Sequence, residues 1–293
     1  MQPLGVLFSV VYALFLWWFL TGLIIVVYTR SLYVRHTFFG AISVVMVLAL
    51  AGLFLTRQQT EPTAVYVALT CGILIWGWQV TGYYLGYITG PHSEEDLRQA
   101  LPDLTDLQGR WFLRFRHAVQ ASLFHELVII GFVVLMAGLT WNAPNRWGLW
   151  IFLALWLMHS LAKINVFLGV RNFHIDFLPA HLHYLGNLLS KRTSNPLLPA
   201  TVIVASVIAL VCVYQGIMPG ATPAKTAGCL FVGTMLGLGV VEHLLLVLPM
   251  PAVLWGWSAK RLPQMDHTTQ TDVKPKRHPT LRATAKQVVE GCD

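Results

Sequence analysis

Two pairs of neighbouring histidine and glutamate residues, His125-Glu126 and Glu242-His243, lie inside apolar stretches long enough to cross a bilayer. Glu126 and Glu242 are the only acidic residues of the sequence in such stretches. An ionised side chain inside a membrane costs on the order of a few kcal/mol, so it needs a partner or a use. These four residues are therefore the first candidates for a functional site.

More polar residues approach the same membrane face. They are Lys163, Asn165, Arg171, Asn172 and, in the segment that follows, His174, Asp176, His181 and His183. With a helical rise of about 1.5 Å per residue, Glu126 would lie roughly 15 Å from that face and Glu242 roughly 10 Å. Lys163 would also lie roughly 10 Å from it. Polar groups from three predicted spans and one loop thus converge on one leaflet.

This convergence has three interpretations. In the first, Glu126, Glu242 and Lys163 neutralise one another and the histidines hydrogen-bond between helices, which makes a structural brace. In the second, the His-Glu pairs and a loop histidine bind iron or zinc, although the histidines lack the i, i+4 spacing of a helical metal motif. In the third, a neutral histidine is the axial ligand of a tetrapyrrole such as bacteriochlorophyll.

These residues must be positioned by larger structural elements. Composition indicates that those elements are membrane-spanning helices. The chain is 56% hydrophobic and only 11% charged, with a mean hydropathy of +0.61, whereas soluble domains carry roughly 25% charged residues. This balance excludes most soluble enzymes and nucleic-acid-binding domains, and the lack of strict alternation excludes a β-barrel. The predicted fold is all-α and polytopic, with seven spans: Leu4–Tyr28, Phe38–Leu55, Ala64–Thr89, Phe115–Thr140, Gly148–Val170, Pro199–Ile217 and Ala224–Leu248.

The distribution of basic residues predicts the orientation of these spans. Sixteen of the twenty Lys and Arg residues fall on one side of the predicted membrane and three on the other, with Lys163 inside a span. The positive-inside rule then places the N-terminus outside and the C-terminus in the cytoplasm. The net charge of +7 therefore reflects membrane topology and not nucleic-acid binding.

Two segments differ from the spans in composition. Residues 110–116, Arg-Trp-Phe-Leu-Arg-Phe-Arg, predict an interfacial helix on anionic lipid that leads into the fourth span. We expect residues 1–262 to form a single transmembrane domain. Residues 263–293 are polar and interrupted by proline, which predicts a disordered cytoplasmic tail.

Several sequence blocks together resemble the photosynthetic complex assembly protein 2 family, the PuhE-type proteins of purple phototrophic bacteria. The longest is LALWLMHSLAKINVFLGVRNFHIDFLPAHLHYL at residues 153–185. The others, in order along the chain, are LWWFLTGLI, WGWQVTGYYLGYITGP, FHEL, TWNAPNRWGLW, NPLLP and EHLLLVLPMP. The resemblance covers about residues 10 to 257 and leaves out the tail.

The resemblance implies a multi-pass protein of the bacterial inner or intracytoplasmic membrane, encoded near the reaction-centre H subunit. It implies an assembly factor for the reaction centre and light-harvesting complex one that modulates bacteriochlorophyll supply or binding. Its partners would be subunits of those complexes and other assembly factors. The alternative is a metal-dependent membrane enzyme acting on a tetrapyrrole or isoprenoid pigment.

The family pattern also selects among the candidate residues. The matching positions are His125, Glu126, Asn165, Gly169, Arg171, Asn172, Pro179, His181, Tyr184, Glu242 and His243. His159, His174, Asp176 and His183 fall where that pattern is variable. The selected set nearly coincides with the residues that membrane depth alone brings together.

Overall fold

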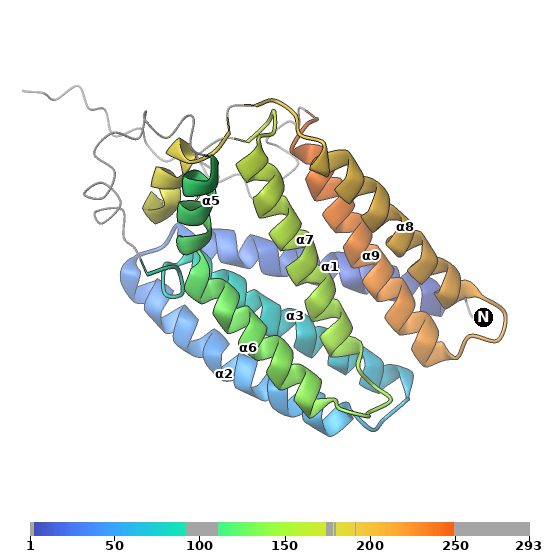
Figure 1. The fold of residues 1–293 in the computed structure, drawn as a ribbon. Helices are drawn as coiled ribbons and strands as arrows, with labels where there is room; N and C mark the ends of the chain where they lie inside the picture. The colour runs from blue at the N-terminus through green and yellow to red at the C-terminus, as the bar shows by residue number, and fades with distance from the viewer. Residues whose placement is uncertain (1–2, 92–110, 174–177, 179, 191, 249–293) are drawn as a thin grey trace, which may run out of the picture. The chain divides into compact units, whose positions relative to one another are not determined.

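The computed structural model describes residues 3–91, 111–173, 178, 180–190 and 192–248. Within these ranges the chain forms eight α-helices and one 3₁₀ helix, and no strand. They are α1 (Pro3–Tyr28), α2 (Leu32–Thr56), α3 (Pro62–Tyr84), α5 (Trp111–Gln120), α6 (Leu123–Leu139), α7 (Trp147–Leu168), η3 (Ala180–Asn187), α8 (Leu197–Ile217) and α9 (Pro223–Leu245) (Figure 1). The predicted boundary at residue 262 and the tail beyond it lie outside the described residues.

Six of these helices are long and apolar enough to cross a membrane on their own. The helices α5 and α6 meet the same test only as a pair, which brings the number of candidate spans to seven. The prediction of an all-α polytopic membrane protein is therefore confirmed. The membrane orientation of the termini stays a prediction.

The third predicted span ends earlier than hydropathy indicates. It was expected to reach Thr89, but α3 ends at Tyr84 because Gly86 adopts a left-handed conformation with φ of 82°. The amide of Gly86 donates to Tyr83 O and the amide of Tyr87 donates to Gly82 O, the hydrogen-bond pattern of a Schellman cap. The apolar residues after the cap are therefore not helical, although their hydropathy extends the predicted span.

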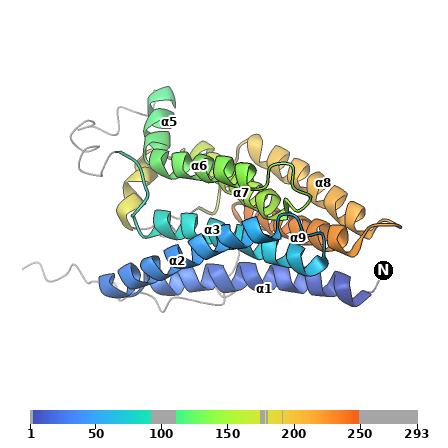
Figure 2. The same cartoon turned by 90° about the horizontal axis from the view of Figure 1, so that it is seen from below.

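The fourth predicted span, Phe115–Thr140, is broken. The axes of α5 and α6 differ by 61°, and Figure 2 shows α5 projecting away from α6. The segment that follows α3 lies against this break, where the amide of His125 donates to Thr89 O over 3.1 Å. A Cβ atom on Gly90 would overlap the backbone oxygen of Gln120. Glu126 therefore lies in the first turn of α6, nearer the end of the bundle than the expected 15 Å.

Helix α5 packs against the ends of α7 and η3. The guanidinium group of Arg114 donates twice to Leu188 O, over 2.8 and 3.0 Å. The ring of Phe115 lies 5.5 Å from that of Phe167. Phe112 and Arg116 face outward on the opposite side of the helix. Residues 111–116 are therefore part of an amphipathic helix, and its location on anionic lipid stays a prediction.

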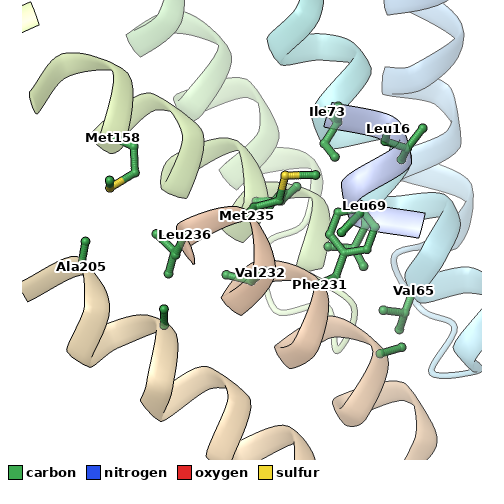
Figure 3. Packing of buried hydrophobic residues seen from close by; sticks show 14 residues of the cluster. Leu16, Val65, Leu69, Ile73, Met158, Ala205, Phe231, Val232, Met235 and Leu236 are labelled. Carbon is green, nitrogen blue, oxygen red and sulfur yellow. The ribbon is translucent and has the colours of Figure 1, made fainter. Parts of the chain in front are cut away.

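Helix α9 is at the centre of the bundle and packs against α1, α3, α7 and α8. Figure 3 shows Phe231 of α9 with Leu69 of α3, and Leu236 of α9 between Met158 of α7 and Ala205 of α8. A second apolar cluster joins α3, α6 and α7 through Ile75, Ile129, Met136 and Phe152. Burial of these apolar contacts fixes the neighbours of each helix and therefore the directions in which its polar residues point.

The helices α1, α3, α7 and α9 finish at one end of the bundle, where α2, α6 and α8 begin. We call this the basic end, because Arg30, Arg35, Arg114, Arg116, Arg171 and Arg192 are found there. Among the described residues, the Lys and Arg side chains at the opposite end are Arg57, Arg146 and Lys225. The positive-inside rule predicts that the basic end faces the cytoplasm.

Reporter insertions can test this orientation. Asn142 is exposed in the turn before α7, and Ser194 is exposed in the segment between η3 and α8, beyond the far end of α7. We expect a periplasm-active enzyme inserted at Asn142 to be active and the same enzyme at Ser194 to be silent. The reverse pattern would contradict the predicted orientation.

Candidate functional site

Glu126 and Lys163 form an ion pair between α6 and α7. Lys163 Nζ lies 2.8 Å from Glu126 Oε1. The exposed fraction of the side chain is 25% for Glu126 and 27% for Lys163. The other carboxylate oxygen of Glu126 accepts a hydrogen bond from Trp156 Nε1 over 3.1 Å. Trp156 and Lys163 are seven residues apart on α7, so one helical face holds both partners of the carboxylate.

Histidine and aromatic rings adjoin this ion pair. The Lys163 ammonium lies 4.7 Å from the centroid of the Tyr83 ring, within the range of a cation–π contact. The ring of His125 lies 4.6 Å from that of Tyr83 and 6.2 Å from that of His159. Both nitrogens of His125 are buried and have no hydrogen-bond partner in the described part of the chain. The ends of α3 and α6 and the middle of α7 thus enclose one polar cluster.

Glu242 has different neighbours from Glu126. Its Oε1 accepts a hydrogen bond from Trp17 Nε1 of α1 over 3.0 Å, and its side chain faces outward. The adjacent His243 is only 1% exposed, and its Nδ1 lies 2.8 Å from Gly239 O of the same helix. The structure therefore separates the predicted polar residues into two groups, one around Glu126 and one around Glu242.

Asn165 takes part in the connection between α7 and α8. Its Nδ2 donates to Thr201 Oγ1 over 3.4 Å, and its backbone oxygen accepts from Asn195 Nδ2 over 3.2 Å. The side-chain Nδ2 of Asn195 also donates to Gly169 O, and its Oδ1 accepts from the backbone amide of Leu198. This arrangement supports a structural role for Asn165, since its contacts join helix ends.

Arg171 and Asn172 follow this connection. The side chain of Arg171 is exposed. The amide of Asn172 donates to Leu246 O over 3.0 Å, which ties the end of α7 to the end of α9. The nearby residues His174, Asp176 and Pro179 lie outside the described part of the chain.

His181 and Tyr184 lie in η3, outside the membrane-spanning helices. The ring of His181 is 3.5 to 3.6 Å from the position that a Cβ of Gly86 would take. Desolvation lowers the pKa of His181 below its ordinary value; hydrogen bonding to the Tyr83 backbone opposes this shift, and Arg35 and His183 add to it. The lowered pKa favours the neutral form of His181, the form that can act as a ligand.

The metal interpretation finds no support in the described part of the chain. No group of three or more His, Cys, Asp or Glu residues there is arranged to hold a metal ion. A metal that arrives already bound within a macrocycle needs only one protein ligand, so this finding does not bear on the tetrapyrrole interpretation.

Sequence reasoning missed the partners of both acids. Trp17 and Trp156 donate to Glu242 and Glu126, but neither tryptophan is singled out as a partner from the sequence. The spacing of Trp156 and Lys163 on one face of α7 is a signal that could have identified the first partner. No comparable signal links Trp17 to Glu242, because they are 225 residues apart.

Comparison with known proteins places the chain in a family. A family model described as "Protein of unknown function (DUF3623)" matches residues 4–266. The chain belongs to this family. A relative from Rhodobacter capsulatus, named "Uncharacterized 30.4 kDa protein in puhA 5'region", is 28% identical over 267 residues, covering 89% of this chain and 93% of that protein. No solved structure matches the chain.

Proposed function

We propose that this protein is a membrane assembly factor for the bacterial photosynthetic reaction centre and light-harvesting complex one. The observation that supports this most is the relative from the puhA 5′ region, which the chain matches over nearly the full length of both proteins. The multi-pass helical fold requires contact with lipid, and the proposed membrane is the inner or intracytoplasmic one. The proposed partners are subunits of these complexes and other assembly factors.

We further propose that the protein binds bacteriochlorophyll or another tetrapyrrole through His243. Its Nδ1 lies at hydrogen-bond distance from Gly239 O, so in the neutral ring Nδ1 carries the proton and Nε2 keeps its lone pair. That Nε2 is buried and has no hydrogen-bond partner among the described residues. A backbone carbonyl that accepts from the other ring nitrogen and so fixes the tautomer is typical of histidines that bind metals.

His125 and His181 are weaker candidates for this ligand. His125 lies between Tyr83 and His159, and neither of its nitrogens has a partner that would fix the tautomer. His181 lies in η3, outside the spans. Since the ring of His243 is 1% exposed, neighbouring side chains have to move before a macrocycle can reach it.

Complementation of a deletion strain tests the assembly role. We expect deletion of the gene in a purple phototrophic bacterium to reduce the absorption of the reaction centre and light-harvesting complex one severalfold, and the wild-type gene to restore it. His243→Ala should accumulate in the membrane but fail to restore it. His36→Ala changes an exposed histidine of α2 and is the matched control. Normal absorption in the deletion strain would refute the assembly role.

A further inference from the structure

Gln79 and His125 are polar side chains that the protein buries completely without satisfying. Both are 0% exposed. The four polar side-chain atoms of the two residues, Nε2 and Oε1 of Gln79 and Nδ1 and Nε2 of His125, have no hydrogen-bond partner among the residues that the structure describes. Leaving a buried donor or acceptor unpaired is unfavourable, so these atoms require a partner that the described part of the chain does not supply.

The two residues belong to one interface. Trp76, Gln79 and Tyr83 share a face of α3, because their spacings of three and four residues place them on one side of a helix. The two ends of this row contact the histidines. The ring centroid of Trp76 lies 5.4 Å from that of His159, and the ring centroid of Tyr83 lies 4.6 Å from that of His125. Gln79 lies between these contacts on α3. Nε2 of His159 is also buried, and no described residue forms a hydrogen bond with it.

These polar groups extend from the basic end into the middle of the bundle. At the outer end is the Glu126–Lys163 ion pair, which keeps a quarter of its exposure. His159 lies nine residues before Leu168, the last residue of α7, which corresponds to roughly 14 Å of helix. This is about half of a hydrocarbon layer of roughly 30 Å. Farther from the basic end, α3, α6 and α7 meet in the second apolar cluster. Its described residues there are the apolar Ile75, Ile129 and Phe152.

We propose that α3, α6 and α7 enclose water molecules that enter beside the ion pair and hydrogen-bond Gln79, His125 and His159. A neutral histidine presents one donor and one acceptor, and a glutamine amide presents two donors and one acceptor. Water supplies both kinds of group, and buried waters typically make about three hydrogen bonds to such atoms. Because the apolar cluster closes the inner end, the hydrated site opens to the basic end only. It is distinct from His243 and does not depend on the proposed function.

Hydroxyl-radical labelling by X-ray radiolysis of the full-length protein in detergent tests this proposal, because bound water is the source of the radicals. After correction for intrinsic side-chain reactivity, we expect Tyr83 and Trp76 to be oxidised several-fold faster than Phe231, which is 0% exposed in the apolar core. Equal protection of all three residues would overturn the proposal. This comparison uses the wild-type chain and so requires no variant to fold.

Gln79→Leu provides a second, independent measurement. If water bridges the amide, the variant breaks the network and lowers the thermal midpoint. If the amide is dry and unpaired, its replacement by an apolar side chain raises the midpoint, which would overturn the proposal. Thr81→Val is the matched control on α3, because Thr81 is also buried but bonds to Gly77 O of its own helix. Its midpoint should change little.

Discussion

Lys163→Met should lower the free energy of unfolding by on the order of 2–3 kcal/mol, and the further change Glu126→Gln should recover most of that loss. Removing one partner of a buried ion pair costs about 3–5 kcal/mol, because the remaining charge is left without compensation. The lower figure here reflects the residual exposure of both side chains. In Lys163→Met, only Trp156 Nε1 would remain as a partner of the Glu126 carboxylate.

A double-mutant cycle measured by unfolding in detergent gives the coupling energy of the pair. Lys225→Met is the control, because Lys225 is exposed and its ammonium bonds only to Gln215 among the described residues; it should change stability by no more than about 0.5 kcal/mol. Additive effects of the two site substitutions would show that the pair does not brace α6 against α7.

Gly72→Ala should destabilise the protein by about 1–3 kcal/mol, the usual cost of overpacking a core. The backbones of α3 and α7 approach each other closely at Gly72. An added Cβ at Gly72 would overlap the backbone oxygen of Gly148 and lie 2.6 Å from Ile151 Cγ2. Because Gly148 O belongs to helix backbone, it cannot turn away as a side chain could, so the helices would have to separate.

Gly77→Ala is the control on the same helix. No atom lies within 4 Å of the position its Cβ would take, so the gain in helix propensity should stabilise the protein by up to about 1 kcal/mol. Thermal midpoints of the two variants should therefore move in opposite directions. Similar midpoints for both would contradict the close approach of α3 to α7.

Hydropathy predicts seven candidate spans, which agrees with the described helices when α5 and α6 count as one span, but it does not predict the positions where the helices stop. The stretch that ends at Thr89 is mostly apolar, yet α3 ends at Tyr84 because Gly86 adopts a left-handed conformation and caps the helix. The break at residues 121–122 has no hydropathy signal either. It follows from the packing of Thr89 and Gly90 against the junction of α5 and α6, which is a tertiary contact.

The polar residues of the candidate site could be predicted from the sequence. Which of them lie together in the structure could not. The cost of burying charge identifies Glu126, Glu242 and Lys163 from sequence alone. Depth along the membrane normal then puts them at similar levels, but it carries no information about the rotation of each helix. Neighbouring residues differ by about 100° around a helix, so Glu242 faces Trp17 while His243 turns into the bundle.

The absorption spectrum of the tagged protein, purified from phototrophically grown cells, tests the proposed function most directly. We predict that the wild-type protein shows tetrapyrrole absorption bands in a constant ratio to the amount of protein. The bands should be lost from the His243→Ala protein and unchanged in the His36→Ala protein. A wild-type protein free of pigment, or equal pigment in the His243→Ala protein, would contradict the assignment of His243 as the ligand.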